Sequence, residues 1–108
     1  MAAFFGGMNY IFLSGEAEGA ATEITDARFG RMAKFPLGLA NDGGDGMPVD
    51  FAVTILAHGK RAAKIFELVG AGTRMVVHGR ITPHEGGVAV YSDWIEFVNV
   101  ARRRAPQA

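Results

Sequence analysis

The sequence contains no cysteine, which excludes disulfide frameworks and thiolate metal sites. It also lacks any apolar run near the roughly 18 residues that a membrane helix needs. Residues 1–7 lack the basic start and long apolar stretch of a secretory signal, so we expect a cytoplasmic protein with no membrane partner. Eleven basic residues balance eleven acidic ones, and the net charge therefore does not by itself indicate a nucleic-acid partner.

Motifs for catalysis and cofactor binding are missing as well. Gly59 and Lys60 lack the upstream glycine and the following hydroxyl residue of a phosphate-binding loop. The three histidines are not spaced as metal ligands on one element. We expect no enzymatic activity, no cofactor and no metal.

The basic residues are distributed unevenly along the chain. Residues 1–54 hold three basic and seven acidic residues, whereas residues 55–108 hold eight basic and four acidic residues. Such basic clusters can neutralise phosphates even in a neutral protein. The alternative is that they are solvated surface charges that keep the protein soluble.

Alternation of apolar and polar residues predicts five strands. In the first, Ile11 and Leu13 face one side and Tyr10 and Phe12 the other. The five are expected at residues 9–15, 31–40, 51–58, 73–82 and 88–100, with a free edge or bulge near Pro36. Residues 16–27 are read as a solvated excursion or a ragged strand, and residues 41–48 as a loop.

Residues 59–72 carry the helical pattern. Apolar residues recur at i, i+3, i+4 and i+7 from Ala62 to Val69, and Gly70 or Gly72 is expected to end the helix in a left-handed conformation. Five strands with one helix between strands 3 and 4 predict an all-β barrel, the oligonucleotide/oligosaccharide-binding (OB) fold. In that fold the second and third strands and the flanking loops bind single strands.

Several sequence blocks follow one another in an order and at spacings known from one family. They are NYIFLSG (9–15), GRMAKFPL (30–37), GKRA (59–62), GTRMVVHG (72–79) and SDWIEFV (92–98). Together they resemble the bacterial-type single-stranded DNA-binding proteins. The resemblance implies an N-terminal extension over residues 1–7, an OB-fold DNA-binding domain over residues 8–100 and a basic C-terminal tail over residues 101–108.

The resemblance implies largely sequence-independent binding of single-stranded DNA in replication, recombination or repair, by base stacking and phosphate pairing. The family's stacking positions fall on Gly43, Ala52, His58 and Gly86, and only His58 has a ring. Stacking is therefore expected to be weak or moved to other rings. The candidates for that move are Phe51, for which we favour a place in the core, Tyr10, Phe12, Tyr91 and Trp94.

Most of the expected contacts to DNA come from basic side chains. The residues expected to contact DNA are Arg28, Arg31, Lys34, Thr54, His58, Lys60, Arg61, Arg74, Arg80 and Trp94. Trp94 is expected on the outer side of its strand, in an interface or against a ligand. Tyr10 and Phe12 lie on the strand through which family members pair, which predicts a homodimer or homotetramer.

The family usually carries an acidic tail tip that recruits replication and repair proteins, whereas this sequence ends in ARRRAPQA. We expect a short form without that recruitment. Three alternatives stay open: a dimer like the primosomal replication protein of the N type, a protein-interaction barrel that has lost nucleic-acid affinity, and an RNA-binding protein.

Overall fold

The computed structural model describes residues 8–41 and 49–98. The predicted N-terminal extension, the basic tail and Gly43 lie outside the described residues. The elements in chain order are β1 (Ile11–Ala17), β2 (Thr22–Asp26), β3 (Gly30–Asn41), β4 (Val49–His58), α1 (Gly59–Leu68), β5 (Arg74–His84) and β6 (Gly87–Val98).

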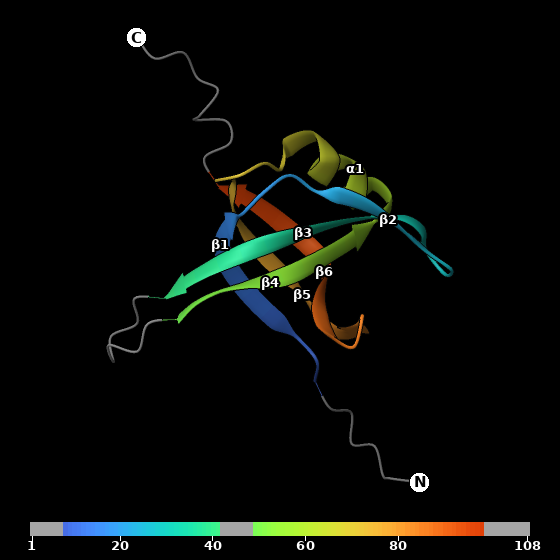
Figure 1. The fold of residues 1–108 in the computed structure, drawn as a ribbon, viewed down its shortest axis with the longest axis horizontal. Helices are drawn as coiled ribbons and strands as arrows, with labels where there is room; N and C mark the ends of the chain where they lie inside the picture. The colour runs from blue at the N-terminus through green and yellow to red at the C-terminus, as the bar shows by residue number, and fades with distance from the viewer. Residues whose placement is uncertain (1–7, 42–48, 99–108) are drawn as a thin grey trace, which may run out of the picture.

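Five of the strands close into a barrel (Figure 1). They follow the order β1-β5-β6-β4-β3, and a short antiparallel pairing of β1 with β3, Glu16 with Gly38 and Ala17 with Leu37, completes the ring. β4 and β6 run parallel, and the other barrel pairs are antiparallel. Because α1 lies between the third and fourth barrel strands, the predicted OB fold is confirmed.

The sixth strand, β2, pairs with β3 outside the barrel ring. It confirms the strand interpretation of residues 16–27. Because β2 is not part of the ring, β4 is the fourth strand along the chain but the third strand of the barrel, and α1 follows it. On β3, the pairing with β2 ends at Lys34 and the pairing with β1 begins at Leu37. Pro36, which has no N–H to donate, lies in the gap between them, as expected of a free edge.

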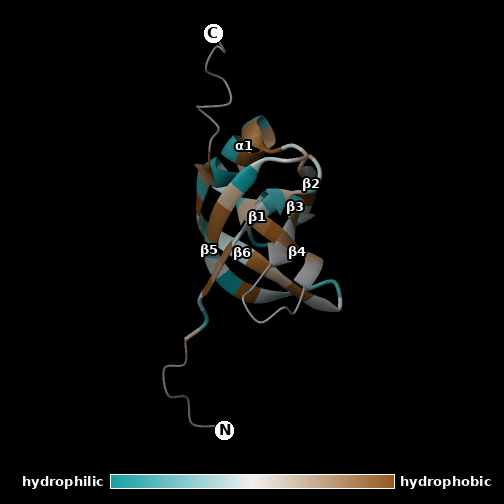
Figure 2. Ribbon diagram, turned by 90° about the vertical axis from the view of Figure 1, so that its left-hand side faces the viewer, coloured by the Kyte–Doolittle hydropathy of each residue, from teal (hydrophilic) through white to brown (hydrophobic). Residues whose placement is uncertain are grey.

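The barrel interior holds the inward-facing residues of each strand. Phe35, Leu37, Ile55 and Val77 are fully buried there, and Figure 2 shows hydrophobic and hydrophilic residues alternating along the strands. α1 lies across one end of the barrel and adds Ala62 and Ile65 to the same core. Burying each large apolar side chain contributes about 1.5–3 kcal/mol, so this core holds the barrel together.

Gly72 has the predicted left-handed conformation, with φ 89°, but the helix ends four residues before it, so the predicted position of the stop is wrong. α1 ends at Leu68, and the following Val69 has an extended conformation with φ −90° and ψ 127°. The hydroxyl of Thr73 accepts a hydrogen bond from the Gly70 N–H (3.0 Å) and donates to the Leu68 carbonyl (3.4 Å). The buried threonine therefore bonds one of the last helical carbonyls and the first glycine after the helix.

No helix among the described residues combines the length and the apolar character that crossing a membrane requires.

Candidate nucleic-acid interface

A row of outward-facing residues crosses four barrel strands. Lys34 on β3 is paired with Leu56 on β4, and Leu56 is paired with Tyr91 on β6. Tyr91 is in turn paired with Arg80 on β5. Adjacent strands lie about 4.8 Å apart, so the register places a tyrosine ring between two cationic side chains on the outer surface.

Under this row lies a small hydrophobic cluster separate from the barrel core. Met32, Leu56 and Ala89 are buried on the outer side of the sheet, and Ile24 and Tyr91 pack against them. Ile24 belongs to β2, so the extra strand extends the apolar support of this face. The outer surface of β3, β4 and β6 is thus built to hold Tyr91 in place.

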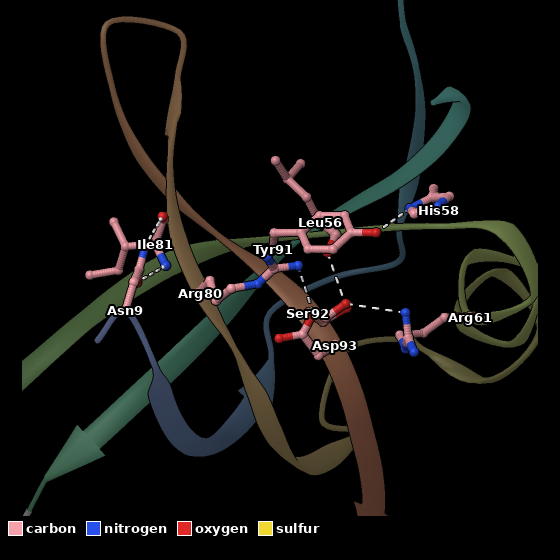
Figure 3. A network of polar contacts seen from close by, with 9 residues as sticks. All are labelled: Asn9, Leu56, His58, Arg61, Arg80, Ile81, Tyr91, Ser92 and Asp93. Carbon is pink, nitrogen blue, oxygen red and sulfur yellow. Dashed lines mark hydrogen bonds and ion pairs between the residues drawn. The ribbon is translucent and has the colours of Figure 1, made fainter. Parts of the chain in front are cut away.

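Three rings gather above this support and form what we call the Phe29 cluster: Phe29, His58 and Tyr91. Their centroids lie 4.5 Å (Phe29 to His58), 5.5 Å (His58 to Tyr91) and 5.8 Å (Phe29 to Tyr91) apart, with planes 26–28° from parallel. The Tyr91 hydroxyl is hydrogen-bonded to Nδ1 of His58 (Figure 3). The three centroids form a triangle, so the near-parallel rings are offset from one another and do not form a single stack.

Phe29, which no sequence pattern singled out, lies in the turn between β2 and β3. The Asp26 carboxylate accepts hydrogen bonds from the backbone N–H groups of Arg28 (2.7 Å) and Phe29 (3.1 Å). These two bonds lower the pKa of Asp26 below its ordinary value. Gly30 follows with φ 74°, a left-handed conformation that suits glycine. The signal that could have located this ring is an aspartate three residues before a phenylalanine-glycine pair.

Two guanidinium groups border the Phe29 cluster. The Arg28 guanidinium lies 5.3 Å from the Phe29 centroid, and that of Arg80 lies 5.4 Å from the Tyr91 centroid. Arg80 also forms an ion pair with Asp93 at 2.9 Å, visible beside the Tyr91 ring in Figure 3. Both predicted binding residues therefore lie where a cation can meet a phosphate next to a stacked base.

Most of the other predicted cations already have carboxylate partners. The ion pairs are Arg31 with Glu23 (3.1 Å), Lys34 with Glu85 (3.2 Å) and Arg74 with Glu16 (3.5 Å). Such surface pairs contribute only about 0–1 kcal/mol each, because water and salt screen them. A phosphate can therefore compete with these carboxylates.

The remaining predicted residues on this side differ in their exposure. Arg61 is partly buried and donates to the Ser92 carbonyl at 3.2 Å, which ties α1 to β6 (Figure 3). Lys60 is exposed in the first turn of α1, next to His58. Thr54 is half-buried on β4, opposite Pro36. Of the three, Lys60 has the freest position for a phosphate contact.

Three predicted DNA contacts lie away from the Phe29 cluster: Arg74, Arg31 and Trp94. Arg74 and Arg80 are six residues apart on β5, which places them roughly 20 Å apart along the strand. Arg31 stacks its guanidinium on Phe66 of α1 at 4.7 Å, beside its ion pair with β2. Trp94 lies further along β6, beside the rings predicted for self-association, and its strand partner His78 is two residues from Arg80 on β5.

That second aromatic surface, the Trp94 surface, consists of Tyr10, Phe12, His78 and Trp94. Phe12 on β1 is paired with His78 on β5, and His78 with Trp94 on β6. The His78 centroid lies 4.4 Å from that of Phe12 and 4.6 Å from that of Trp94, and Nδ1 of His78 is 3.0 Å from the Tyr10 hydroxyl. Tyr10 and Phe12 are 62% exposed and Trp94 is 54% exposed, as expected for outward-facing residues.

The backbone explains in part why this chain has few rings at the positions where stacking was expected from the resemblance. Gly86 has φ 79° in the tight turn between β5 and β6, so an aromatic side chain there would be strained. Ala52 is exposed on β4 and offers no ring. The prediction that Phe51 is a core residue is wrong, because its side chain is 52% exposed on a stretch of β4 that is paired with β3 but not with β6.

An open depression of about 780 Å³ lies between β1, the far end of β3 and the connection from α1 to β5, and it is lined by Glu16, Glu18 and Arg74 among others. It does not include the Phe29 cluster. Within residues 8–41 and 49–98, no group of three or more histidine, aspartate or glutamate side chains is placed to hold a metal ion.

Comparison with known proteins gives a structural match. No family model matches the sequence, and no curated protein matches it. Among solved structures, the chain is similar to the crystal structure of a small single-stranded DNA-binding protein from Streptomyces coelicolor, with a TM-score of 0.72 and 20% identity over 89% of this chain and 98% of that one. At this identity the likeness shows a shared OB fold.

Proposed function

We propose that this protein binds single-stranded DNA, without enzymatic activity, on the outer face of β3, β4 and β6. The observation that carries the proposal is the Phe29 cluster, three near-parallel rings bordered by the guanidinium groups of Arg28 and Arg80. Rings of this kind stack on bases of any sequence, at about 1–3 kcal/mol per base. The OB fold and the single-stranded DNA-binding protein with a similar structure support it.

The phosphate contacts of this proposal come from cations around the cluster. Two of these cations, Lys34 and Arg80, belong to the row across the strands. Arg28 lies in the β2–β3 turn and Lys60 at the start of α1, and Thr54 lies on the same outer face. Phosphate binding at Lys34 and Arg80 exchanges a surface carboxylate for a phosphate, which is a small energetic change. Arg31, Arg61 and Arg74 hold elements together, so we give them a lesser role.

Self-association through β1 is part of the same proposal. Tyr10, Phe12 and Trp94 form an exposed aromatic surface, and exposed patches of this kind typically mark interfaces between proteins. A homodimer or homotetramer would bury it and leave the Phe29 cluster for DNA. A role in replication, recombination or repair, in the cytoplasm, follows from the proposed ligand.

A titration of fluorescein-labelled oligo-dT, followed by anisotropy at several salt concentrations, tests the proposal. With about four to six phosphates neutralised, log affinity should fall against log salt with a slope of roughly −3 to −4. A duplex of the same length is the control and should bind more weakly. The absence of saturable binding to oligo-dT at low salt would overturn the proposal.

A second candidate is a protein-interaction barrel without nucleic-acid affinity. It is favoured by the ion pairs that already engage Arg31, Lys34, Arg74 and Arg80, together with a net charge of zero. The same titration separates the two, because this candidate predicts no anisotropy change at any salt concentration. Competition by oligo-U in the titration distinguishes DNA from RNA as the preferred ligand.

A further inference from the structure

Phe29, in the turn between β2 and β3, has no role in the pattern that suggested the function. We propose that Phe29, in place of His58, is the ring on which a nucleobase of the single strand stacks. This inference rests on the proposed function and names the residue of that site that makes the base contact. It assigns to the β2–β3 hairpin, an addition to the barrel ring, the task of presenting this ring.

The geometry of the cluster carries the inference. Phe29 lies against His58 with a centroid distance of 4.5 Å and an interplanar angle of 27°, so one face of the histidine is covered. His58 and Tyr91 are half-buried, whereas Phe29 is 41% exposed. Phe29 is therefore the most exposed ring of the cluster, and a base reaches it without displacing another ring.

The backbone around Phe29 is held in place before any ligand binds. Asp26 receives two backbone hydrogen bonds from the turn, and the strand pairing of Asp26 with Gly30 closes it. His58 and Tyr91 support the ring from below. A preorganised ring loses little conformational entropy on binding, so more of the stacking energy appears as affinity.

Arg28 provides the cation that accompanies the base. Its guanidinium lies 5.3 Å from the Phe29 centroid, and it forms no ion pair with the described residues. A base that stacks on Phe29 takes the place of this guanidinium on the ring. The released cation then lies within reach of the phosphate of the same nucleotide, and no carboxylate has to be displaced.

Three variants of Phe29 distinguish a stacking ring from a lid over His58. Phe29→Ala should bind oligo-dT about 5- to 140-fold more weakly, which is the conversion of 1–3 kcal/mol at 1.4 kcal/mol per tenfold. Phe29→Leu keeps apolar bulk but has no aromatic face, and it should also bind weakly. Phe29→Trp should bind at least as tightly as the wild type. Unchanged or tighter binding by Phe29→Ala and Phe29→Leu would overturn the inference.

The matched control is Phe12→Ala on the Trp94 surface, assayed with an oligonucleotide long enough for one chain only. It should leave affinity unchanged. If the wild type binds and the Phe29 variants bind equally well, the inference fails and the proposed function stands. If the wild type does not bind, both fail. Cross-linking of wild-type protein to oligonucleotides containing 5-iodouracil gives a result independent of variant folding: the modified peptide should contain Phe29, and modification confined to other peptides contradicts the inference.

Discussion

Two aromatic surfaces on one barrel differ in ring geometry and in charge. In the Phe29 cluster the ring planes lie within 28° of parallel, and two guanidinium groups lie over its rings. On the Trp94 surface, Tyr10 and Phe12 are also near-parallel, at 25°, but Phe12 and Trp94 meet His78 at 79° and 48°, and among the described residues no cation stacks on these rings. Near-parallel rings with stacked cations suit bases and phosphates, whereas an aromatic surface without stacked cations suits a protein partner.

The largest expected effect is a loss of self-association, which tests whether the two surfaces have different roles. Phe12→Asp places a carboxylate in the middle of the Trp94 surface. Central aromatic residues of interfaces typically contribute at least about 2 kcal/mol, so self-association should weaken by about 30-fold or more. Sedimentation equilibrium measures it. Affinity for a short oligo-dT should stay as in the wild type, and loss of DNA binding with intact association would reverse the two assignments.

A second variant compares two arginines on the same strand. Arg80→Ala removes the guanidinium above Tyr91, and the slope of log affinity against log salt should become shallower by about 0.7, the value for one phosphate on a single strand. Arg74→Ala is the matched control, since that arginine lies beside Glu16 away from the cluster. Equal slopes for Arg80→Ala and the wild type would remove Arg80 from the interface.

A smaller effect of opposite sign is expected from the carboxylates. Glu85→Gln frees Lys34 from its ion pair, so oligo-dT should bind more tightly, by up to about fivefold for a pair of at most about 1 kcal/mol. The increase should shrink as salt rises. Glu16→Gln frees Arg74 outside the interface and should change nothing. Equal gains from the two variants would indicate a general charge effect.

The smallest effect concerns the pH dependence of the turn that carries Phe29. The hydrogen bonds from Arg28 and Phe29 lower the folded-state pKa of Asp26 below 3.8. Their stabilisation is therefore complete above the ordinary carboxyl range and is lost as pH falls through the lowered pKa. The amide NMR signals of Arg28 and Phe29 should be constant between about pH 5 and 8 and shift only in stronger acid. Movement near neutral pH would contradict this role of Asp26.

Local patterns predicted the barrel strands but not where the sheet ends. Alternation correctly placed Ile11 and Leu13 inside and Tyr10 and Phe12 outside. The same rule assigned Phe51 to the core, because period-2 alternation identifies a side of the sheet and not the end of the barrel. The helix ends earlier than predicted for a similar reason, since the Leu68 carbonyl is bonded by Thr73, beyond the predicted end, while Gly72 is left-handed but outside the helix.

The Phe29 cluster is the part of the candidate site that sequence patterns could not predict. His58 and Tyr91 are brought together by the parallel pairing of β4 and β6, and Phe29 reaches them from a turn outside the barrel ring. A single aromatic residue in a turn gives no periodic signal. The cations were easier to predict as a group, but their ion pairs depend on strand register that charge patterns do not show.

The single tryptophan of the sequence, Trp94, lies on the surface that we assign to self-association and reports on the central claim directly. Oligo-dT is titrated twice, once labelled and followed by anisotropy, and once unlabelled and followed by Trp94 emission. Binding at the Phe29 cluster predicts saturable anisotropy with little change in Trp94 emission. Quenching of Trp94 in step with the anisotropy would place the DNA on the other surface and contradict the account.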